Sequence, residues 1–425
     1  MNEKSFLFRI NTKISDLCSR VPNTAYFLLL LVYFIAKAVF FRKNFFVLDT
    51  TVWQSQELTM DYSYGFIRRG LIGSFVTLIR NCFNIEYPAA IKTVQNIGFI
   101  LFAAAILLFF YVLLKNKNEK ACCYLVLIYI ALDQIGFELN SFGLLDNYII
   151  AITLLMVFLI VKDKLLFLIP FLSGICVMIH EGYPMMFFGV IVALLIYKFC
   201  YAEDKKAKQK YATVFVSTGL IVSALFVYFY ILHPRIDNPD VEAILASCTE
   251  RLGTEFKHGT LMNIWLDPVP VSDPEHAVSL MWLDGKPTAL FYLYTMLPIF
   301  NIIVCSPLIV QVVLFWKGII HNEPSKFKKL LLFVCSLAVF LVIPLIIFHL
   351  DQARWFYDVI FFETVVIGSI FLINANNERD VLSKLTKIGI LKILMLLFYC
   401  VFFIQLVPGQ MGFISLFYIK YFIMA

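Results

Sequence analysis

Charged residues are scarce in this sequence. They make up 15% of its 425 residues, whereas hydrophobic residues make up 61%, and soluble domains average roughly 25% charged residues. This shortage excludes an ordinary water-soluble protein. The net charge of +6 does not indicate nucleic-acid binding, because the excess Lys and Arg residues lie in short loops between apolar runs.

Several other signals are missing. No repeat, low-complexity tract or Ser/Gly-rich linker divides the chain, so we expect a single membrane domain over 1–425. The ten cysteines include no CxxC pair with zinc spacing, and most lie in apolar runs, so we predict neither a disulfide framework nor a zinc site. The first apolar run lacks a small-residue cleavage site and leads into Arg42 and Lys43, which predicts an uncleaved first span.

Long apolar runs dominate what is present. A helix needs about 20 apolar residues to cross a bilayer, and the runs predict an all-α polytopic membrane protein of about eleven spanning helices, within a range of ten to twelve. The division of 165–200 and of 289–316 stays open. The runs cover 24–41, 95–114, 121–137, 146–161, 165–178, 184–196, 211–232, 289–316, 330–348, 359–372 and 388–406.

The distribution of basic residues predicts the orientation. With the N-terminus in the cytoplasm, 22 of the 35 Lys and Arg residues lie in the inner segments, which are short, as the positive-inside rule requires. The first external loop then covers 42–90 and a second large external loop covers 233–288. The apolar residues repeat every four positions, at Ile67, Leu71, Phe75 and Ile79, and predict an interfacial helix over 65–79. In the second loop, Asp240 predicts the N-cap of a short helix with an apolar stripe of Val241, Ile244, Leu245, Cys248 and Leu252.

Ionisable residues within the predicted spans are expected near the outer ends. Lys37, Asp133 and Glu363 all fall there, and none is placed at a bilayer centre. Ion-coupled transporters and proton relays keep such groups near the midplane. The pattern therefore argues against transport and predicts a working surface at the outer membrane boundary.

The densest group of chemically useful residues lies in the first external loop. Asp61 and Asp49 are candidate catalytic residues, because an exposed carboxylate accepts the proton of an attacking sugar hydroxyl. The adjacent Arg68 and Arg69 suit a phosphate or pyrophosphate head group, whose oxygens they bind in bidentate fashion. The alternative interpretation is that Asp61 caps the interfacial helix and the arginines touch ordinary lipid phosphates.

Two further groups are candidates for substrate binding. In one, Asp351 and Arg354 precede Trp355, so that Arg354 would meet phosphate and Trp355 would stack on a sugar ring; a self-contained ion pair with Trp355 in the aromatic belt is the alternative. The other comprises His180, Glu181 and Asp146 at external turns between short spans. A solvated turn is the alternative for His180 and Glu181.

With its cytoplasmic N-terminus, long acidic first external loop, interfacial helix and later short spans, the chain resembles the GT-C membrane glycosyltransferases. The resemblance covers most of the chain as topology. It implies a catalytic carboxylate in the first loop, here Asp61 or Asp49, although the adjacent acidic pair usual in that family is absent. The stretches 64–73 and 351–355 also look similar to repeat-unit polymerases of bacterial capsule and O-antigen clusters.

Both resemblances imply the same expected function: glycosyl transfer in cell-surface polysaccharide assembly at the outer face of the bacterial cytoplasmic (inner) membrane. Monomer transfer and repeat-unit polymerisation both stay open. The expected partners are a polyprenyl-phosphate-linked sugar donor, a glycan acceptor, membrane lipid and polysaccharide-assembly proteins, with no nucleic acid. No cofactor and no metal ligand is predicted, and the need for a divalent metal stays open. The alternatives are a transporter or flippase for a lipid-linked glycan, a membrane acyltransferase with His180 as base, and a non-catalytic assembly subunit.

Overall fold

The structure is a computed structural model of the whole chain. It describes residues 12–13, 16–17, 20–115, 120–232, 240–257, 282–283, 286–287, 306, 309–321, 323–342 and 352–373. Within these residues the fold is helical apart from one antiparallel pair of two-residue strands, β1 (Trp282–Leu283) and β2 (Lys286–Pro287). The predictions for Asp351, and for the runs 289–305 and 388–406, lie outside the described residues.

Long apolar helices make this chain a helical membrane protein. Four helices of the described part are long and apolar enough to cross a membrane: Asn23–Phe40, Tyr87–Lys115, Cys122–Leu139 and Lys205–Phe229. Shorter apolar helices cover Gly70–Phe83, Leu168–Ile179, Phe188–Tyr201 and Ile309–His321. The count of about eleven spans therefore stays a prediction.

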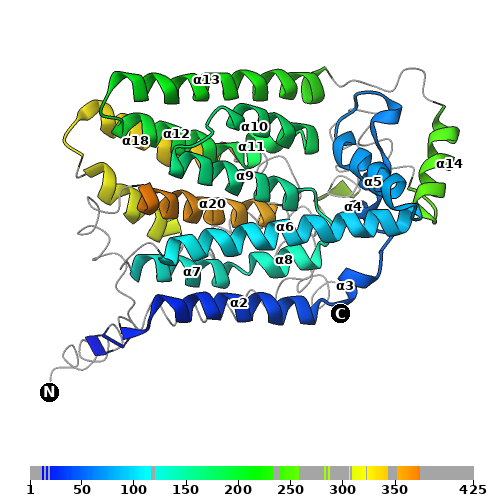
Figure 1. Cartoon of the computed structure of the whole chain (residues 1–425), viewed down its shortest axis with the longest axis horizontal. Helices are drawn as coiled ribbons and strands as arrows, with labels where there is room; N and C mark the ends of the chain where they lie inside the picture. Colours follow the sequence, from blue (N-terminus) through cyan, green and yellow to red (C-terminus); the bar gives the residue numbers. More distant parts are fainter. Residues whose placement is uncertain are drawn as a thin grey trace.

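The long helices lie side by side as a bundle, and short elements gather at one end of it (Figure 1). The bundle contains α2 (Asn23–Phe40), α6 (Tyr87–Lys115), α7 (Lys120–Leu132), α8 (Gln134–Asn140), α9 (Asp146–Lys162), α10 (Leu168–Ile179), α11 (Tyr183–Met186), α12 (Phe188–Tyr201), α13 (Lys205–Phe226), α18 (Lys326–Leu337), the 3₁₀ helix η5 (Ala338–Val342) and α20 (Gln352–Ile373). The short elements at the end are α3 (Lys43–Phe46), α4 (Trp53–Gln56), α5 (Gly70–Phe83) and α14 (Val241–Leu252).

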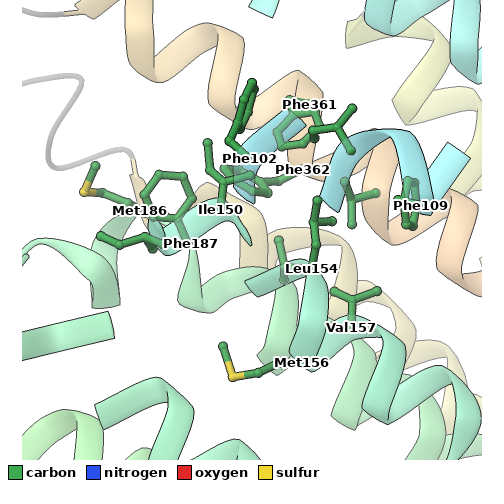
Figure 2. Packing of buried hydrophobic residues seen from close by; sticks show 14 of the residues in the cluster. Phe102, Phe109, Ile150, Leu154, Met156, Val157, Met186, Phe187, Phe361 and Phe362 are labelled. Carbon is green, nitrogen blue, oxygen red and sulfur yellow. The ribbon is translucent and has the colours of Figure 1, made fainter. Parts of the chain in front are cut away.

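Aromatic side chains fill the centre of the bundle. Phe187, at the junction of α11 and α12, packs edge-on against Phe362 of α20 with ring centroids 4.8 Å apart, and Phe361 lies beside Phe362 (Figure 2). Phe102 and Phe109 of α6 belong to the same cluster and are fully buried. These contacts join α6, α12 and α20 into one core, which gives the end elements a fixed support.

One apolar helix of the bundle is broken at an acidic residue. Asp133 separates α7 from α8 and adopts the left-handed conformation at φ 51°. Its carboxylate accepts a hydrogen bond from the Tyr33 hydroxyl and lies 2.6 Å from the Lys37 ammonium, both on α2. The sequence predicts an uninterrupted run here; the ion pair with α2 explains why a charged residue is buried at the break.

The position of Glu363 differs from the expectation. The sequence places it near the outer end of a span over 359–372, but α20 begins at Gln352, so Glu363 lies at the middle of a 22-residue helix. It is fully buried, and one of its oxygens accepts a hydrogen bond of 2.9 Å from the Trp316 indole. Glu363 is therefore a mid-helix carboxyl rather than a boundary one.

The first loop, predicted to be external, is folded onto the bundle rather than extended away from it. It contains α3, α4, two 3₁₀ turns, η1 (Glu57–Thr59) and η2 (Tyr62–Tyr64), and α5. Three side chains from the start of α6 fasten it: Lys92 donates to the Asn44 carbonyl, Gln95 to the Ser55 hydroxyl and Asn96 to the Phe45 carbonyl. Because α6 belongs to the bundle core, the loop has a rigid base.

Both predicted loop helices exist, with one shift. The helix expected over 65–79 begins later, at Gly70, because Gly65 and Arg69 both adopt positive φ and interrupt the helical path. Its most buried face carries Ile72, Gly73 and Val76. Of the expected stripe, Leu71, Phe75 and Ile79 are only partly buried, and Ile67 is buried but precedes the helix. For the second helix, the prediction is confirmed: the Asp240 carboxylate caps α14, and Ile244, Cys248 and Leu252 are buried.

Candidate functional site

The candidate site lies where the first loop meets the turn between α10 and α11. Arg69 occupies the N-cap position of α5 in the left-handed conformation, φ 60°. This conformation is strained for a residue other than glycine, and such strain persists only where surrounding contacts fix it. Here the side chain turns away from α5 toward Glu57 and Glu181, so the contacts that fix Arg69 are ionic.

Arg69 connects two carboxylates that are far apart in the chain. Its Nε and Nη2 donate to the two oxygens of Glu181, at 3.0 and 2.8 Å, across a separation of 112 residues. Its Nη1 donates to Glu57 Oε1, and the Trp53 ring lies 5.9 Å from its Cζ. The guanidinium fork therefore joins η1, α5 and the α10–α11 turn at one point, with the bidentate geometry that makes arginine–carboxylate pairs strong.

Arg68 and His180 border this network. Arg68 Nη1 lies 3.7 Å from Glu181 Oε1. His180 Nδ1 accepts a hydrogen bond of 2.9 Å from the Gly182 backbone N–H, so this nitrogen carries no proton, although it is also 3.8 Å from Glu181. The turn backbone thus orients His180. Both side chains keep partial solvent exposure.

The pKa values of the two glutamates move in opposite directions. Burial by itself opposes ionisation of Glu181, but the charges of Arg69 and Arg68 hold its pKa well below the ordinary value. Burial raises the pKa of Glu57 above its ordinary value, and Arg69 offsets only part of that increase. Environments that separate the pKa values of two neighbouring carboxyls are typical of acid–base sites, with Glu57 the more readily protonated member here.

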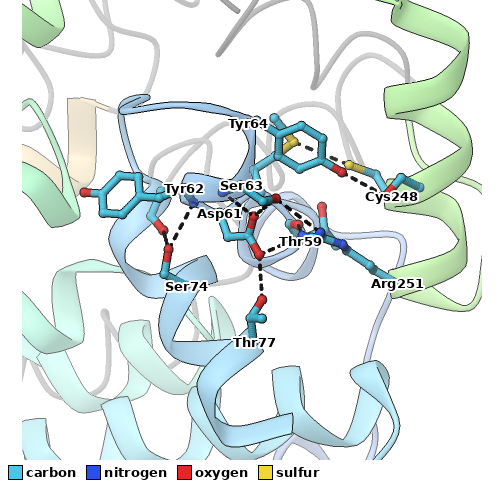
Figure 3. Close-up of polar contacts among 12 residues, drawn as sticks. Thr59, Asp61, Tyr62, Ser63, Tyr64, Ser74, Thr77, Cys248 and Arg251 are labelled. Atoms are coloured by element: carbon cyan, nitrogen blue, oxygen red, sulfur yellow. Dashed lines mark hydrogen bonds and ion pairs between the residues drawn. The ribbon is translucent and has the colours of Figure 1, made fainter. Parts of the chain in front are cut away.

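Asp61 lies in a separate network with α14 (Figure 3). Its Oδ1 accepts from the backbone N–H and the hydroxyl of Ser63, while its Oδ2 accepts from the Thr77 hydroxyl at 2.6 Å and lies 3.0 Å from Arg251 Nη1. Asp61 is almost fully buried. The premise that Asp61 is an exposed carboxylate is therefore wrong: it caps η2 and fastens the first loop to α5 and α14.

Asp49 differs from Asp61 in its exposure. Its side chain is open to solvent, and its Oδ1 accepts hydrogen bonds from the backbone N–H and the hydroxyl of Thr51. Nearby, Lys257 donates to the Thr51 carbonyl at 2.7 Å, which brings the segment after α14 against the same turn. Asp49 therefore keeps the access to solvent that a base in the first loop requires.

The remaining predicted residues belong to the bundle. Asp146 is the first residue of α9 and is buried. Arg354 and Trp355 lie in the first turn of α20, but their side chains, like Asp351, are outside the described residues. One turn later, Asp358 accepts a hydrogen bond of 3.4 Å from Gln134 Nε2, which also donates to Glu138. This places the start of α20 next to α8.

The structure thus brings together Arg68, Arg69, His180 and Glu181, and it adds residues to which the sequence assigns no role. Glu57 stands in the acidic first loop, but nothing in its spacing from Arg69 indicates a contact, because the chain between them is not helical. Arg251 lies in the last turn of α14, between the stripe residues Cys248 and Leu252, and gives no separate signal. In the described part of the chain no group of three His, Cys, Asp or Glu side chains is arranged to hold a metal ion.

Comparisons with known proteins add no assignment. No protein-family model, no curated protein and no solved structure matches this chain.

Proposed function

We propose that this chain transfers glycosyl groups from a polyprenyl-phosphate-linked donor during assembly of a cell-surface polysaccharide. In this proposal it has about eleven spans and a cytoplasmic N-terminus, and the site of Arg68, Arg69, His180 and Glu181 faces outward from the bacterial cytoplasmic membrane. The convergence of Arg69, Glu57 and Glu181 beside Arg68 carries the proposal. An arginine pair fixed at the end of a membrane bundle suits a lipid-linked phosphate.

Each residue has a proposed role. Arg68 contacts the donor phosphate and stabilises the charge that develops as the sugar leaves. Arg69 is a positioning residue, because its fork already holds Glu57 and Glu181. His180 and Glu181 border the sugar. The remaining substrate contacts are proposed to come from Asp146, Asp351, Arg354 and Trp355.

The general base is proposed among the carboxylates of the first loop. Asp49 fits this role better than Asp61, because Asp61 would have to break its ion pair with Arg251 and its hydrogen bond from Thr77 before it could accept a proton. Glu57 is a further candidate, since burial raises its pKa and it adjoins the arginines. In either case the acceptor hydroxyl gives up its proton as it attacks the donor sugar, and the polyprenyl phosphate or pyrophosphate departs.

The test uses cells of the native host that lack the chromosomal copy and carry plasmid-borne variants at equal protein levels. We expect Arg68→Ala and Asp49→Asn to lower the amount of surface glycan at least about tenfold, within the range of losses for a phosphate contact or a general base. Arg80→Ala is the matched control: Arg80 is an exposed arginine of α5 whose side chain lies over the Tyr87 ring and donates to Asn81.

The glycan pattern also separates the two reactions within this class. Glycan that stops at one repeat unit would identify a repeat-unit polymerase, and glycan that lacks one sugar would identify a monomer transferase. Normal glycan in both variants would contradict the proposed function.

The mid-helix position of Glu363 favours a second candidate, a transporter or flippase for a lipid-linked glycan. A buried carboxyl at the centre of a membrane helix is a feature of proton-coupled transport. In that case Glu363→Gln would leave lipid-linked glycan on the cytoplasmic leaflet, whereas Arg68→Ala would not. Leaflet-specific labelling of the glycan in the two variants distinguishes this candidate from glycosyl transfer.

A further inference from the structure

Next to Arg68 lies a group of aromatic rings that no step above uses. The Phe66 ring is centred 5.3 Å from Tyr62, 5.5 Å from Tyr228 and 5.0 Å from Phe229. We call these four residues the aromatic cluster. It joins the segment between η2 and α5 to the end of α13, two parts of the chain more than 160 residues apart.

The cluster combines a fixed base with an open face. Phe229 is fully buried, whereas 44% of Phe66 remains exposed. Tyr228 and Phe229 lie in a single π-helical turn, η3 (Val227–Ile231), that continues α13. Such turns are rare and occur frequently at functional sites. An exposed phenylalanine held on a buried aromatic base is ready to contact a further apolar group.

The exposed side of α13 leads from the bilayer to this cluster. The exposed apolar residues of α13 are Phe215, Val216, Leu220 and Ile221, followed by Val227 in η3 and by Leu232 after it. Under the proposed function the candidate span Lys205–Phe229 crosses the membrane, so that these side chains face lipid. The cluster therefore continues a lipid-facing surface up to the arginine pair.

Charge and hydrogen bonding limit the kind of molecule that fits. Arg68 follows Phe66 by only two residues, so the two backbones lie close together, and the Arg68 side chain keeps some solvent exposure. The Tyr62 hydroxyl is buried and has no hydrogen-bond partner among the described residues, and its ring is directed away from Asp61 (Figure 3). A buried hydroxyl without a partner is costly, and a bound polar head group would satisfy it. The matching ligand has a hydrocarbon chain with an anionic head.

We infer that the aromatic cluster receives the first part of the hydrocarbon chain of a polyprenyl phosphate whose phosphate contacts Arg68. This rests on the proposed function and specifies how its donor enters: along α13, from the lipid, past Phe66. Bulk phospholipid is the competing occupant, because it also pairs an anionic head with an apolar tail. The polyprenyl lipid is the occupant we commit to, since a reaction at Arg68 requires its phosphate there.

The test measures equilibrium binding of undecaprenyl phosphate to the purified full-length protein in nanodiscs of neutral lipid. We expect Phe66→Ala to weaken binding about tenfold, the effect of losing roughly half of the transfer free energy of a buried phenylalanine. Leu78→Ala, which removes an exposed apolar side chain of α5, is the matched control and should leave binding unchanged. The wild type should bind geranyl phosphate more weakly than undecaprenyl phosphate, and an excess of phosphatidylglycerol should not displace the ligand.

The outcomes separate the two proposals. Equal affinity of Phe66→Ala and wild type, equal affinity for the long and short chains, or displacement by phosphatidylglycerol would overturn the aromatic cluster as a polyprenyl site and leave the phosphate site intact. Unchanged binding in Arg68→Ala together with weaker binding in Phe66→Ala would overturn the phosphate contact of the proposed function and leave the cluster intact. The chain-length comparison uses only wild-type protein, so it holds even if a variant folds poorly.

Discussion

At the scale of single residues, the ionic contacts of Arg69 compensate for its strained backbone conformation. Its left-handed backbone costs about 1–2 kcal/mol relative to ordinary helix geometry. The contacts of its guanidinium with Glu57 and Glu181 offset that cost, since both carboxylates are buried and would otherwise lack this cation. The residue is therefore fixed by its charge partners and not by its local sequence.

Removing Arg69 should destabilise the protein strongly. Arg69→Ala leaves Glu57 and Glu181 buried without their shared cation, and breaking a buried pair in this way costs about 3–5 kcal/mol. Thermal unfolding in detergent, followed by circular dichroism, should show a clearly lower midpoint, and adding Glu57→Gln should recover part of the loss. Arg80→Ala should change the midpoint little. An Arg69→Ala protein as stable as the wild type would show that the ion pairs of Arg69 with Glu57 and Glu181 do not stabilise the fold.

Asp61 should make stability depend on pH in one direction. Burial opposes its ionisation, but hydrogen bonds from Ser63 and Thr77 and the charge of Arg251 hold its pKa below the ordinary value of 3.8. A lowered pKa in the folded state adds stability that is present above pH 4 and is lost as the pH falls through the folded-state pKa. Asp61→Asn should thus cost roughly 1.5–3 kcal/mol at pH 7.

The pH series provides the check. The difference in unfolding midpoint between Asp61→Asn and wild type should narrow as the pH is lowered from 5 toward 3. A difference that stays constant over this range would mean that the charge of Asp61 contributes nothing to folding.

At the scale of elements, sequence patterns predict regular helices well and their interruptions poorly. The N-cap at Asp240 and the start of α9 at Asp146 follow from local rules, and the structure has both. The late start of α5 and the break between α7 and α8 depend on left-handed residues, Arg69 and Asp133, which are not glycines. Tertiary ion pairs fix both conformations, so no local pattern could indicate them.

The packing of α5 on the first loop depends on Gly73. A Cβ added there would lie 1.8 Å from the Met60 carbonyl oxygen, which is backbone and cannot move aside. We expect Gly73→Ala to separate α5 from the loop and to lower the unfolding midpoint by several degrees, within the range of overpacked sites. Gly219→Ala in α13, where an added Cβ meets nothing, is the control and should be neutral or slightly stabilising. Equal midpoints for the two variants would contradict the close approach.

At the scale of the whole molecule, the site combines segments that are far apart in the sequence. At the level of the sequence, only their predicted position on the same side of the membrane connects them. Placing Arg68, Arg69, His180 and Glu181 on one side of the bilayer followed from the distribution of basic residues, and the structure brings these four together. Glu57 and Arg251 could not be placed in advance, because their partners are 12 and 190 residues away without a periodic link. These contacts form because the first loop is attached to α6, which belongs to the bundle.

The most direct test of the account asks which side of the membrane the site faces. In a Cys82→Ser background, which removes the exposed cysteine of the described residues, one cysteine at a time is introduced at exposed Asp49, in the first loop, or at exposed Lys206, at the far end of α13. A membrane-impermeant maleimide should label the Asp49→Cys protein in intact cells and the Lys206→Cys protein only after permeabilisation. Labelling of Lys206→Cys in intact cells, with Asp49→Cys protected until the membrane is opened, would contradict an outward-facing site and the glycosyl transfer proposed for it.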